Sequence, residues 1–490
     1  MNRRAGSGHT AAMLDLLTEV LASAPARCSY AEARHVATDE EDLLVRNGRV
    51  DHVDSTSADG VGVRVRAGGG WGFAATREVA RSGIEHALAR ALAIAESQPA
   101  APAGPLTAVA PARGHWSCAY EQDPFDVSLE DKLELLFAAE AALRGDPRIV
   151  RSDAACASRR VRTAFASTEG AACTQQRVEC GGAVAVIAVD GDELQVRSYP
   201  SAHGGSAACA GWEHVLGFDL VANAPGVAAE ALELLSAPAC PPGRATVILG
   251  GDQLALQIHE SIGHALELDR MLLMEASYAG TSWVSPADLG ALRYGSERLN
   301  ITADATLAGG LGTFGWDDEG VAARRIALIE GGVLRATLSD RGSAAAIGLD
   351  RSGGCARADG FARQPIVRMT NVSIEPGAAG TLAELVADTD DGLYLETNRS
   401  WSIDDRRLHF QFATEVAREI RGGELGRLLR NPSYAGVTPR FWSGLDAVCS
   451  ASEWRVWGLG NCGKGEPGQL MRVSHGTAPA RFRDVQVGVA

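Results

Sequence analysis

The chain has 490 residues, which is enough for two to four domains, and its 46% hydrophobic and 22% charged residues are ordinary for a soluble globular protein. Its net charge of −15 opposes binding to nucleic acid or anionic membranes, so we expect neither as a partner. The ten cysteines contain no CxxC pair, which excludes a disulfide framework and indicates a reducing, cytoplasmic compartment.

The first 26 residues imitate a secretory signal, with an arginine pair, an apolar stretch and small residues after it. Asp15 and Glu19 interrupt that stretch, so we expect an amphipathic helix whose apolar face carries Leu17 and Val20. No run approaches the 18 apolar residues of a membrane span.

An N-terminal αβ domain is predicted over residues 1–97. Apolar and polar residues alternate over 28–76, and Asn47 followed by Gly48 is a strong hairpin signal. A helix is expected over 78–97. Residues 98–114 are rich in Pro and Ala without periodicity, which predicts a linker.

A middle αβ domain is predicted over residues 115–240, ending at a proline-rich break. Ser128 is placed to cap its first helix, which Gly145 would end. The expected elements are helices over 128–144 and 219–236 and strands near 148–167, 173–189 and 192–200.

The C-terminal domain, residues 241–490, is predicted to be largely antiparallel β structure around one helix that carries a metal site. A buried strand over 243–250 precedes that helix, which Asp252 is placed to cap. Further strands are expected at 325–329, 333–338, 366–374, 392–396 and 480–488, and helices at 341–348 and 381–387. The predicted fold class is therefore α+β.

The most informative stretch runs from His259 and Glu260 to His264. Imidazole is a common zinc ligand, and a carboxylate directly after a ligand can act as general base. Histidines at i and i+5 lie about 140° apart on a regular helix, too far round to share one ion. A shared metal therefore predicts a π-bulge, or a break at Gly263, within 259–264. The alternative is two unrelated histidines on a buried amphipathic helix.

A third metal ligand has several candidates. Cys462 lies among glycines, in what we expect to be a flexible turn where a thiolate can approach an ion. The rival ligands that the residues leave open are His409, His475, Asp317, Asp318 and Glu319.

Two glycine patterns carry no nucleotide site. Residues 310–315 match GxGxxG, but an acidic turn follows and would repel a pyrophosphate. Residues 458–464 match most of a P-loop, but Gly465 stands where Ser or Thr should hold magnesium.

Taken together, these segments resemble the TldD/PmbA family of metallopeptidases. The resemblance rests on residues 259–269, on 312–320, on the C-terminal stretch 460–488, and on Gly62–Arg64 and 71–74 near the N-terminus. It implies that His259, His264 and Cys462 bind one zinc ion per chain and that Glu260 is the general base. All four are kept, as in TldD-like subunits and unlike PmbA-like ones.

The resemblance also implies a cytoplasmic dimer, either a homodimer or a heterodimer with a PmbA-like subunit. Its substrates would be peptides or unstructured protein segments, held in an internal cavity by strand-type backbone pairing. Two alternatives stay open: a non-catalytic structural subunit of such a complex, and a zinc hydrolase of a non-peptide amide. His475 and Tyr278 are candidate donors to the oxyanion.

Overall fold

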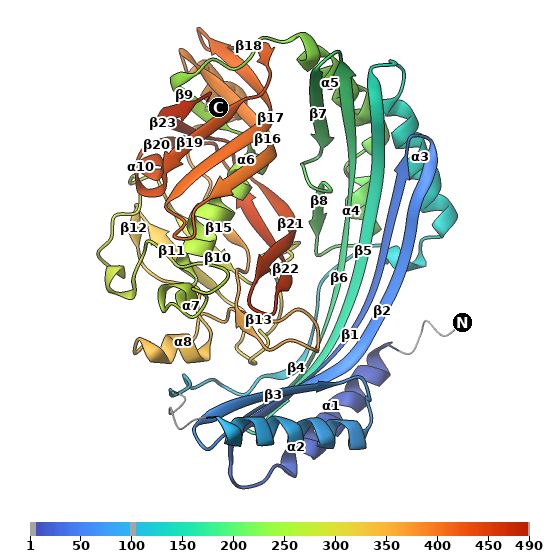
Figure 1. The fold of residues 1–490 in the computed structure, drawn as a ribbon, viewed down its shortest axis with the longest axis vertical. Helices are drawn as coiled ribbons and strands as arrows, with labels where there is room; N and C mark the ends of the chain where they lie inside the picture. The colour runs from blue at the N-terminus through green and yellow to red at the C-terminus, as the bar shows by residue number, and fades with distance from the viewer. Residues whose placement is uncertain (1–5, 99–103, 489–490) are drawn as a thin grey trace.

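The computed structural model describes residues 6–98 and 104–488. Its fold class is α+β, as predicted. A long curved sheet lies between a layer of helices and a C-terminal region built mainly of antiparallel strands (Figure 1). The candidate metal site lies inside that C-terminal region.

The long sheet has eight strands in the order β3-β2-β1-β5-β6-β4, with β7 and β8 paired to β6. The predicted hairpin turn is confirmed, because Asn47 and Gly48 have φ of 48° and 74°. The strands are β1 (Cys28–Arg46), β2 (Arg49–Ala67), β3 (Gly70–Thr76), β4 (Arg113–Ser117), β5 (Ile149–Ser167), β6 (Ala172–Asp190), β7 (Glu193–Tyr199) and β8 (Ser206–Ala208).

Helices cover one face of this sheet (Figure 1). Leu17 and Val20 are buried there, while Asp15 and Glu19 stay exposed, as the amphipathic pattern predicts. Ser128 caps its helix by accepting a hydrogen bond from the backbone of Asp131. The helices are α1 (Gly6–Ala22), α2 (Arg81–Ser97), α3 (Leu129–Leu143), α4 (Trp212–Leu216) and α5 (Leu220–Ser236), with a short turn η1 (Pro124–Asp126).

The sheet runs through both of the N-terminal domains that the sequence predicts. β1 pairs antiparallel with β5 from Glu32 opposite Ser167 to Arg46 opposite Asp153. Within the predicted linker, residues 99–103 lie outside the described residues, residues 104–112 form no regular element, and β4 begins at Arg113. The domain limits at 97, 115 and 240 stay predictions.

A ring of strands forms the top of the C-terminal region in Figure 1. Its order is β16-β9-β23-β19-β17, and β17 pairs back to β16, so the sheet closes on itself. Two further strands pair with members of the ring: β18 with β17, and β20 with β23. The strands are β9 (Gly243–Leu249), β16 (Asp391–Ile403), β17 (His409–Arg421), β18 (Glu424–Leu429), β19 (Ser433–Val437), β20 (Leu445–Val448) and β23 (Ala480–Val487).

Smaller elements complete the region below the ring. The strands are β10 (Ile301–Asp304), β11 (Arg325–Glu330), β12 (Val333–Leu334), β13 (Ala356–Arg357), β14 (Ile366–Val367), β15 (Val372–Ile374), β21 (Arg455–Lys464) and β22 (Gln469–Thr477). The helices are α6 (Gly251–Ile258), α7 (Leu268–Met271), α8 (Arg341–Ala346), α9 (Leu382–Ala387) and α10 (Thr438–Ser443), with short turns η2 (His259–Gly263), η3 (His264–Leu266) and η4 (Pro286–Asp288).

Two predicted strands here are wrong in length. The strand expected over 333–338 keeps only two residues, and the one expected over 366–374 splits into β14 and β15. The gap holds Arg368 and Asn371, whose side chains bond backbone carbonyls of neighbouring segments. Long-range polar contacts thus replace a local strand pattern.

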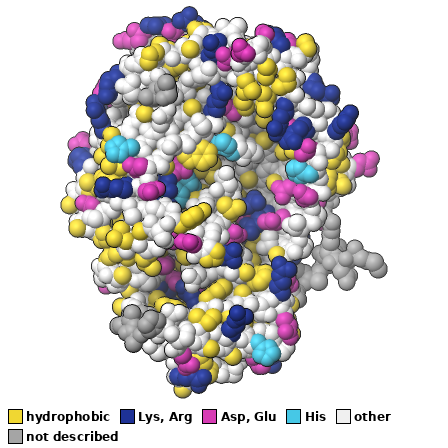
Figure 2. Space-filling view, in the orientation of Figure 1, with side chains coloured by type: hydrophobic (Ala, Val, Ile, Leu, Met, Phe, Trp, Pro, Cys, Tyr) yellow, Lys and Arg dark blue, Asp and Glu magenta, His cyan; other side chains and the backbone are white. Residues whose placement is uncertain are grey.

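The surface carries mixed charge. On the face shown in Figure 2, basic side chains are interspersed with acidic and apolar ones. Among the described helices, none is long and apolar enough to cross a membrane. All ten cysteines are free thiols.

Candidate metal centre

The helix that leads to the motif follows directly from a strand of the closed ring. α6 begins at Gly251 with Gly250 as its N-cap, so the cap predicted at Asp252 is wrong. Asp252 lies inside the first turn, where its carboxylate accepts hydrogen bonds from the backbone of Gln253 and Thr397. A Cβ on Gly250 would lie 3.0 Å from both Glu396 and Tyr394 of β16, which explains a glycine at this close approach.

The helix changes its pitch at the motif. Residues His259–Gly263 form a π-helical turn, in which the backbone N–H of His264 donates to the carbonyl of His259, five residues earlier. The predicted irregularity within 259–264 is therefore confirmed. The wider turn brings both rings to one side, with their centroids 4.7 Å apart.

Gly263 permits this turn to pack tightly. A Cβ there would lie 2.1 Å from the sulfur of Met369, closer than any side chain tolerates. Within the same turn, the carbonyl of Ser261 accepts a hydrogen bond from Tyr294, and the Ser261 hydroxyl accepts one from the indole of Trp442. The altered backbone pairing is thus compensated by buried side chains.

Cys462 approaches the two histidines from a strand. It lies in β21, so the flexible turn predicted for it is wrong; the Gly-rich stretch forms an irregularity in the β21–β22 register, between Leu459 and Cys462. His259, His264 and Cys462 offer ligand atoms that all lie within 4.8 Å of one another, and all three residues are buried. No other such group of three or more occurs within 6–98 and 104–488.

The donor set fits zinc. The Cys462 sulfur lies 3.5 Å from Nε2 of His264, close to the distance of about 3.6 Å between a thiolate and an imidazole on tetrahedral zinc. Burial lowers the pKa of His259 to about 4 and also lowers the pKa of His264, which keeps their nitrogens free to bind a cation. Burial opposes ionisation of the Cys462 thiol, but the contact with His264 and the positive charge of Arg368 outweigh it and lower that pKa.

A buried charged cluster orients His264. Its Nδ1 lies 2.9 Å from Oε2 of Glu267, which also accepts a hydrogen bond from Arg270 and lies 3.3 Å from the ammonium of Lys464. Lys464 in turn bonds both carboxylate oxygens of Asp269. Burial raises the pKa of Glu267, but Lys464 and His264 overcome it and hold that pKa well below its usual range. Glu267 is therefore an anion that fixes the His264 ring with Nε2 toward Cys462.

A neutral chain orients His259. Its Nδ1 lies 2.9 Å from Nε2 of His475, and Nδ1 of His475 lies 2.6 Å from the carbonyl of Val372. Since a carbonyl only accepts, His475 donates from Nδ1 and accepts at Nε2, so His259 donates from Nδ1 and keeps the Nε2 lone pair free. His475, a rival ligand by sequence, thus lies behind His259 rather than in the cluster.

Glu260 is held by an arginine. Nη1 of Arg407 lies 2.6 Å from Oε2 of Glu260, and the two side chains are 16% and 8% exposed. Arg407 lies in the β16–β17 turn with φ of 62°, an uncommon conformation for a residue with a side chain. The residues His259, His264 and Cys462 are each at most 4% exposed, so the centre lies in the interior of the C-terminal region.

The other sequence candidates lie elsewhere. His409 is 64% exposed and pairs with Asp404. Asp317 accepts only backbone hydrogen bonds, Asp318 pairs with Arg34, and Glu319 pairs with Arg64. Tyr278, a candidate oxyanion donor, is 69% exposed in the loop after α7.

Sequence reasoning missed Arg407, Glu267 and Lys464. Glu267 follows His264 by three residues, and Lys464 follows Cys462 by two on the same strand. A search for charged residues within one turn or one strand repeat of each ligand would have found both. Arg407 has no such signal, since 147 residues separate it from Glu260.

A buried helical turn with two imidazoles and a carboxylate, facing a thiol, can hold a metal ion with a general base beside it. Models of three PmbA/TldA metallopeptidase regions match the chain in order: domain 1 over residues 31–95, the central domain over 122–237, and the C-terminal domain over 242–489. The chain belongs to the TldD/PmbA family of metallopeptidases, which confirms the resemblance seen in the sequence.

Individual relatives agree. A metalloprotease of Methanothermobacter thermautotrophicus is 29% identical over 474 residues, covering 97% of this chain and 98% of that protein. A zinc metalloprotease TldD homolog of Saccharolobus solfataricus is 28% identical over 251 residues, covering 50% of this chain and 52% of that protein. The crystal structure of TldE from Thermococcus kodakarensis is similar in fold, with a TM-score of 0.74 at 14% identity, covering 97% of this chain and all of that one.

Proposed function

We propose that this metallopeptidase is a zinc-dependent peptidase in which His259, His264 and Cys462 hold one zinc ion per chain. The observation that carries the proposal is the π-helical turn, which brings two imidazoles five residues apart to within ligand distance of one thiol. Bound zinc would supply Lewis acidity to the scissile carbonyl and to the attacking water.

Glu260 is the general base in this proposal. It follows the ligand His259 directly. Its carboxylate pairs with Arg407, whereas the Glu267 carboxylate contacts the ring of His264. Glu260 would accept the proton of the attacking water and pass it to the leaving amine. Arg407 keeps the carboxylate in place and offers a guanidinium where negative charge develops.

Peptides and unstructured segments are the proposed substrates. The three ligand residues are almost fully buried, so a flexible chain is better suited than a folded surface to present a peptide bond there. We further propose that the substrate cavity is enclosed by a dimer, with a second copy or a PmbA-like subunit, in the cytoplasm, as family membership implies.

One observation favours the alternative of a non-catalytic subunit. The Glu260 carboxylate is already engaged by the Arg407 guanidinium at 2.6 Å, so it must leave that contact at least in part before it reaches a substrate water. A zinc hydrolase acting on a non-peptide amide would use the same residues. Digestion assays separate these three functions.

The decisive test replaces Glu260 with Gln, which keeps the shape of the side chain but cannot accept a proton. We expect zinc content to stay at wild-type level and hydrolysis of flexible peptides to fall by about 10²–10⁴-fold. Metal analysis and mass spectrometry of a digested peptide library measure the two quantities.

Glu297→Gln is the matched control. It makes the same chemical change at an exposed position outside the proposed metal centre. Wild-type turnover in Glu260→Gln would remove the general-base assignment. A zinc-loaded wild type that cuts no peptide would leave the non-catalytic or non-peptide functions.

A further inference from the structure

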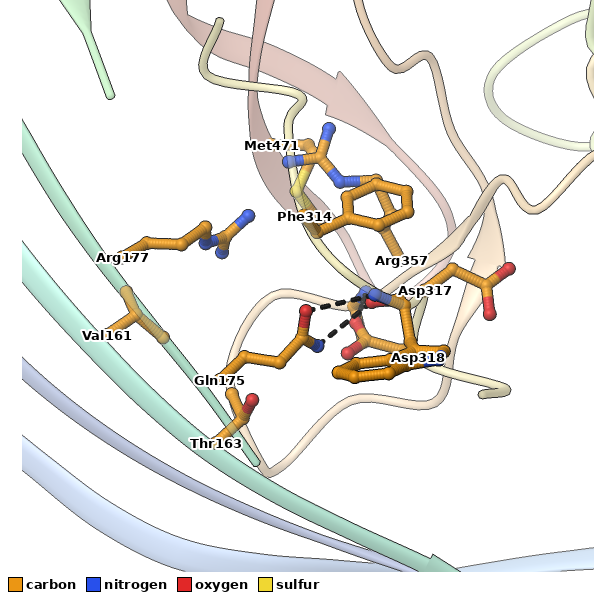
Figure 3. A pocket seen from close by; sticks show the side chains of 11 residues that line it. Val161, Thr163, Gln175, Arg177, Phe314, Asp317, Asp318, Arg357 and Met471 are labelled. Carbon is orange, nitrogen blue, oxygen red and sulfur yellow. Dashed lines mark hydrogen bonds between the residues drawn. The ribbon is translucent and has the colours of Figure 1, made fainter. Parts of the chain in front are cut away.

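A small cavity lies between the long sheet and the C-terminal region (Figure 3). Its volume is about 40 Å³. β5 and β6 form one wall, and the loop at 314–318, β13 and Met471 form the other. Met471, which lines the cavity, pairs across β21 and β22 with Cys462.

Two arginines point their guanidinium groups into this gap from opposite walls (Figure 3). Arg177 comes from β6, and its nearest carboxylate, on Glu179, is 3.9 Å from Nε, too far for a hydrogen bond. No residue in the described ranges accepts a hydrogen bond from the Arg177 side chain. Arg357 is 3% exposed and donates only to the neutral carbonyls of Met369 and Leu311.

The polar groups of the walls have partners elsewhere. The Asp317 carboxylate accepts three backbone N–H groups, and Asp318 forms an ion pair with Arg34 at 2.9 Å. Both ends of the Gln175 amide bond the backbone of the facing loop, as the dashed lines of Figure 3 show. Neither guanidinium group therefore forms a hydrogen bond with a carboxylate. The nearest anion is Glu179, which also attracts Arg159 and Arg472.

The charge of one carboxylate, Glu179, is thus shared among several arginines. Burial and the charge of Arg177 lower the pKa of Arg357 to about 9. An anion between the two guanidinium groups would remove that repulsion. The planar guanidinium fork matches a carboxylate, and about 40 Å³ has room for about three water-sized groups, the number of heavy atoms in a carboxylate.

We propose that this cavity binds a carboxylate group between Arg177 and Arg357. The proposal goes beyond the peptidase function and does not rest on it. A carboxylate has two possible sources, a small free acid such as acetate or the C-terminal end of a peptide.

Calorimetric titration of the full metal-free chain with sodium acetate at constant ionic strength tests the site. We expect one acetate per chain, and an affinity lowered about tenfold or more in Arg177→Gln, because a charge-assisted hydrogen bond is lost. Arg162→Gln is the matched control: it makes the same charge change on the neighbouring strand, where Arg162 pairs with Asp39. Arg357→Lys keeps the charge but not the fork, and should also weaken binding.

Three results would overturn the proposal: no binding heat from acetate, equal affinity in wild type and Arg177→Gln, or equal affinity for chloride. Competition then identifies the source. A tripeptide with a free C-terminus should displace acetate if a chain end is the ligand, and should fail to do so if the ligand is a small acid. Equal displacement by the amidated tripeptide would contradict carboxylate recognition.

Discussion

His264 turns its Nδ1 toward a carboxylate inside a buried cluster of charges, whereas His259 turns its own toward a neutral imidazole. On the first side, Glu267 is balanced by Arg270 and Lys464. On the second, the chain passes through His475 and ends at a backbone carbonyl. Both arrangements leave Nε2 free, but only the first places a full negative charge behind the ligand.

This difference predicts unequal contributions to metal binding. A carboxylate behind an imidazole increases its basicity as well as fixing the ring, while a neutral acceptor mainly fixes the ring. The thiolate supplies charge directly. We therefore expect the effect of substitutions to fall in the order Cys462, Glu267, His475.

Cys462→Ser should have the largest effect. Sites with four ligands bind zinc with about 10–16 kcal/mol, so one thiolate contributes about 3 kcal/mol, or about 100-fold in affinity. Competition with a chelating dye measures this. Cys449→Ser is the control, since Cys449 is buried in the same hydrophobic core outside the ligand cluster. Full zinc occupancy in Cys462→Ser would make another residue the third ligand.

Glu267→Gln should come next, with zinc affinity lowered about 10–100-fold, the usual effect of losing a carboxylate behind a histidine ligand. The amide still orients the ring but removes the charge that balances Arg270 and Lys464. A melting curve without metal separates a loss of stability from a loss of affinity. Unchanged affinity at unchanged stability would show that charge on this side does not matter.

His475→Leu should have the smallest effect, about two- to tenfold in zinc affinity, because one neutral hydrogen bond is lost. His475→Gln should recover much of it, since a side-chain amide can both accept and donate. The same chelator competition compares the two variants. If His475→Leu weakened zinc binding more than Glu267→Gln, the contrast between the two sides would be reversed.

The sequence predicted features that depend on neighbouring residues. The spacing of His259 and His264 required an irregular turn, Ser128 capped its helix, and Asn47 with Gly48 made the hairpin. Each follows from geometry within about one helical turn or one β-turn.

Features that depend on distant residues were missed or wrong. Nothing local places Arg407 beside Glu260 or joins Lys464 to Glu267 across the fold. Cys462 was expected in a flexible turn because glycines surround it, yet pairing with β22 extends the strand through it. Asp252 had the right chemistry for a cap, but the helix starts two residues earlier, at a close contact with β16.

The pairing of β1 with β5 also bears on how the protein is made. Residues that lie side by side there are more than a hundred positions apart in the chain, so this pairing has a high contact order. While the ribosome has released only the first hundred residues, the β1–β2 hairpin has one unsatisfied edge. A nascent chain in this state presents the kind of open strand that invites pairing with other chains. Pairing with β5 covers that edge, so the β1–β2 hairpin completes its folding only together with the segment that contains β5.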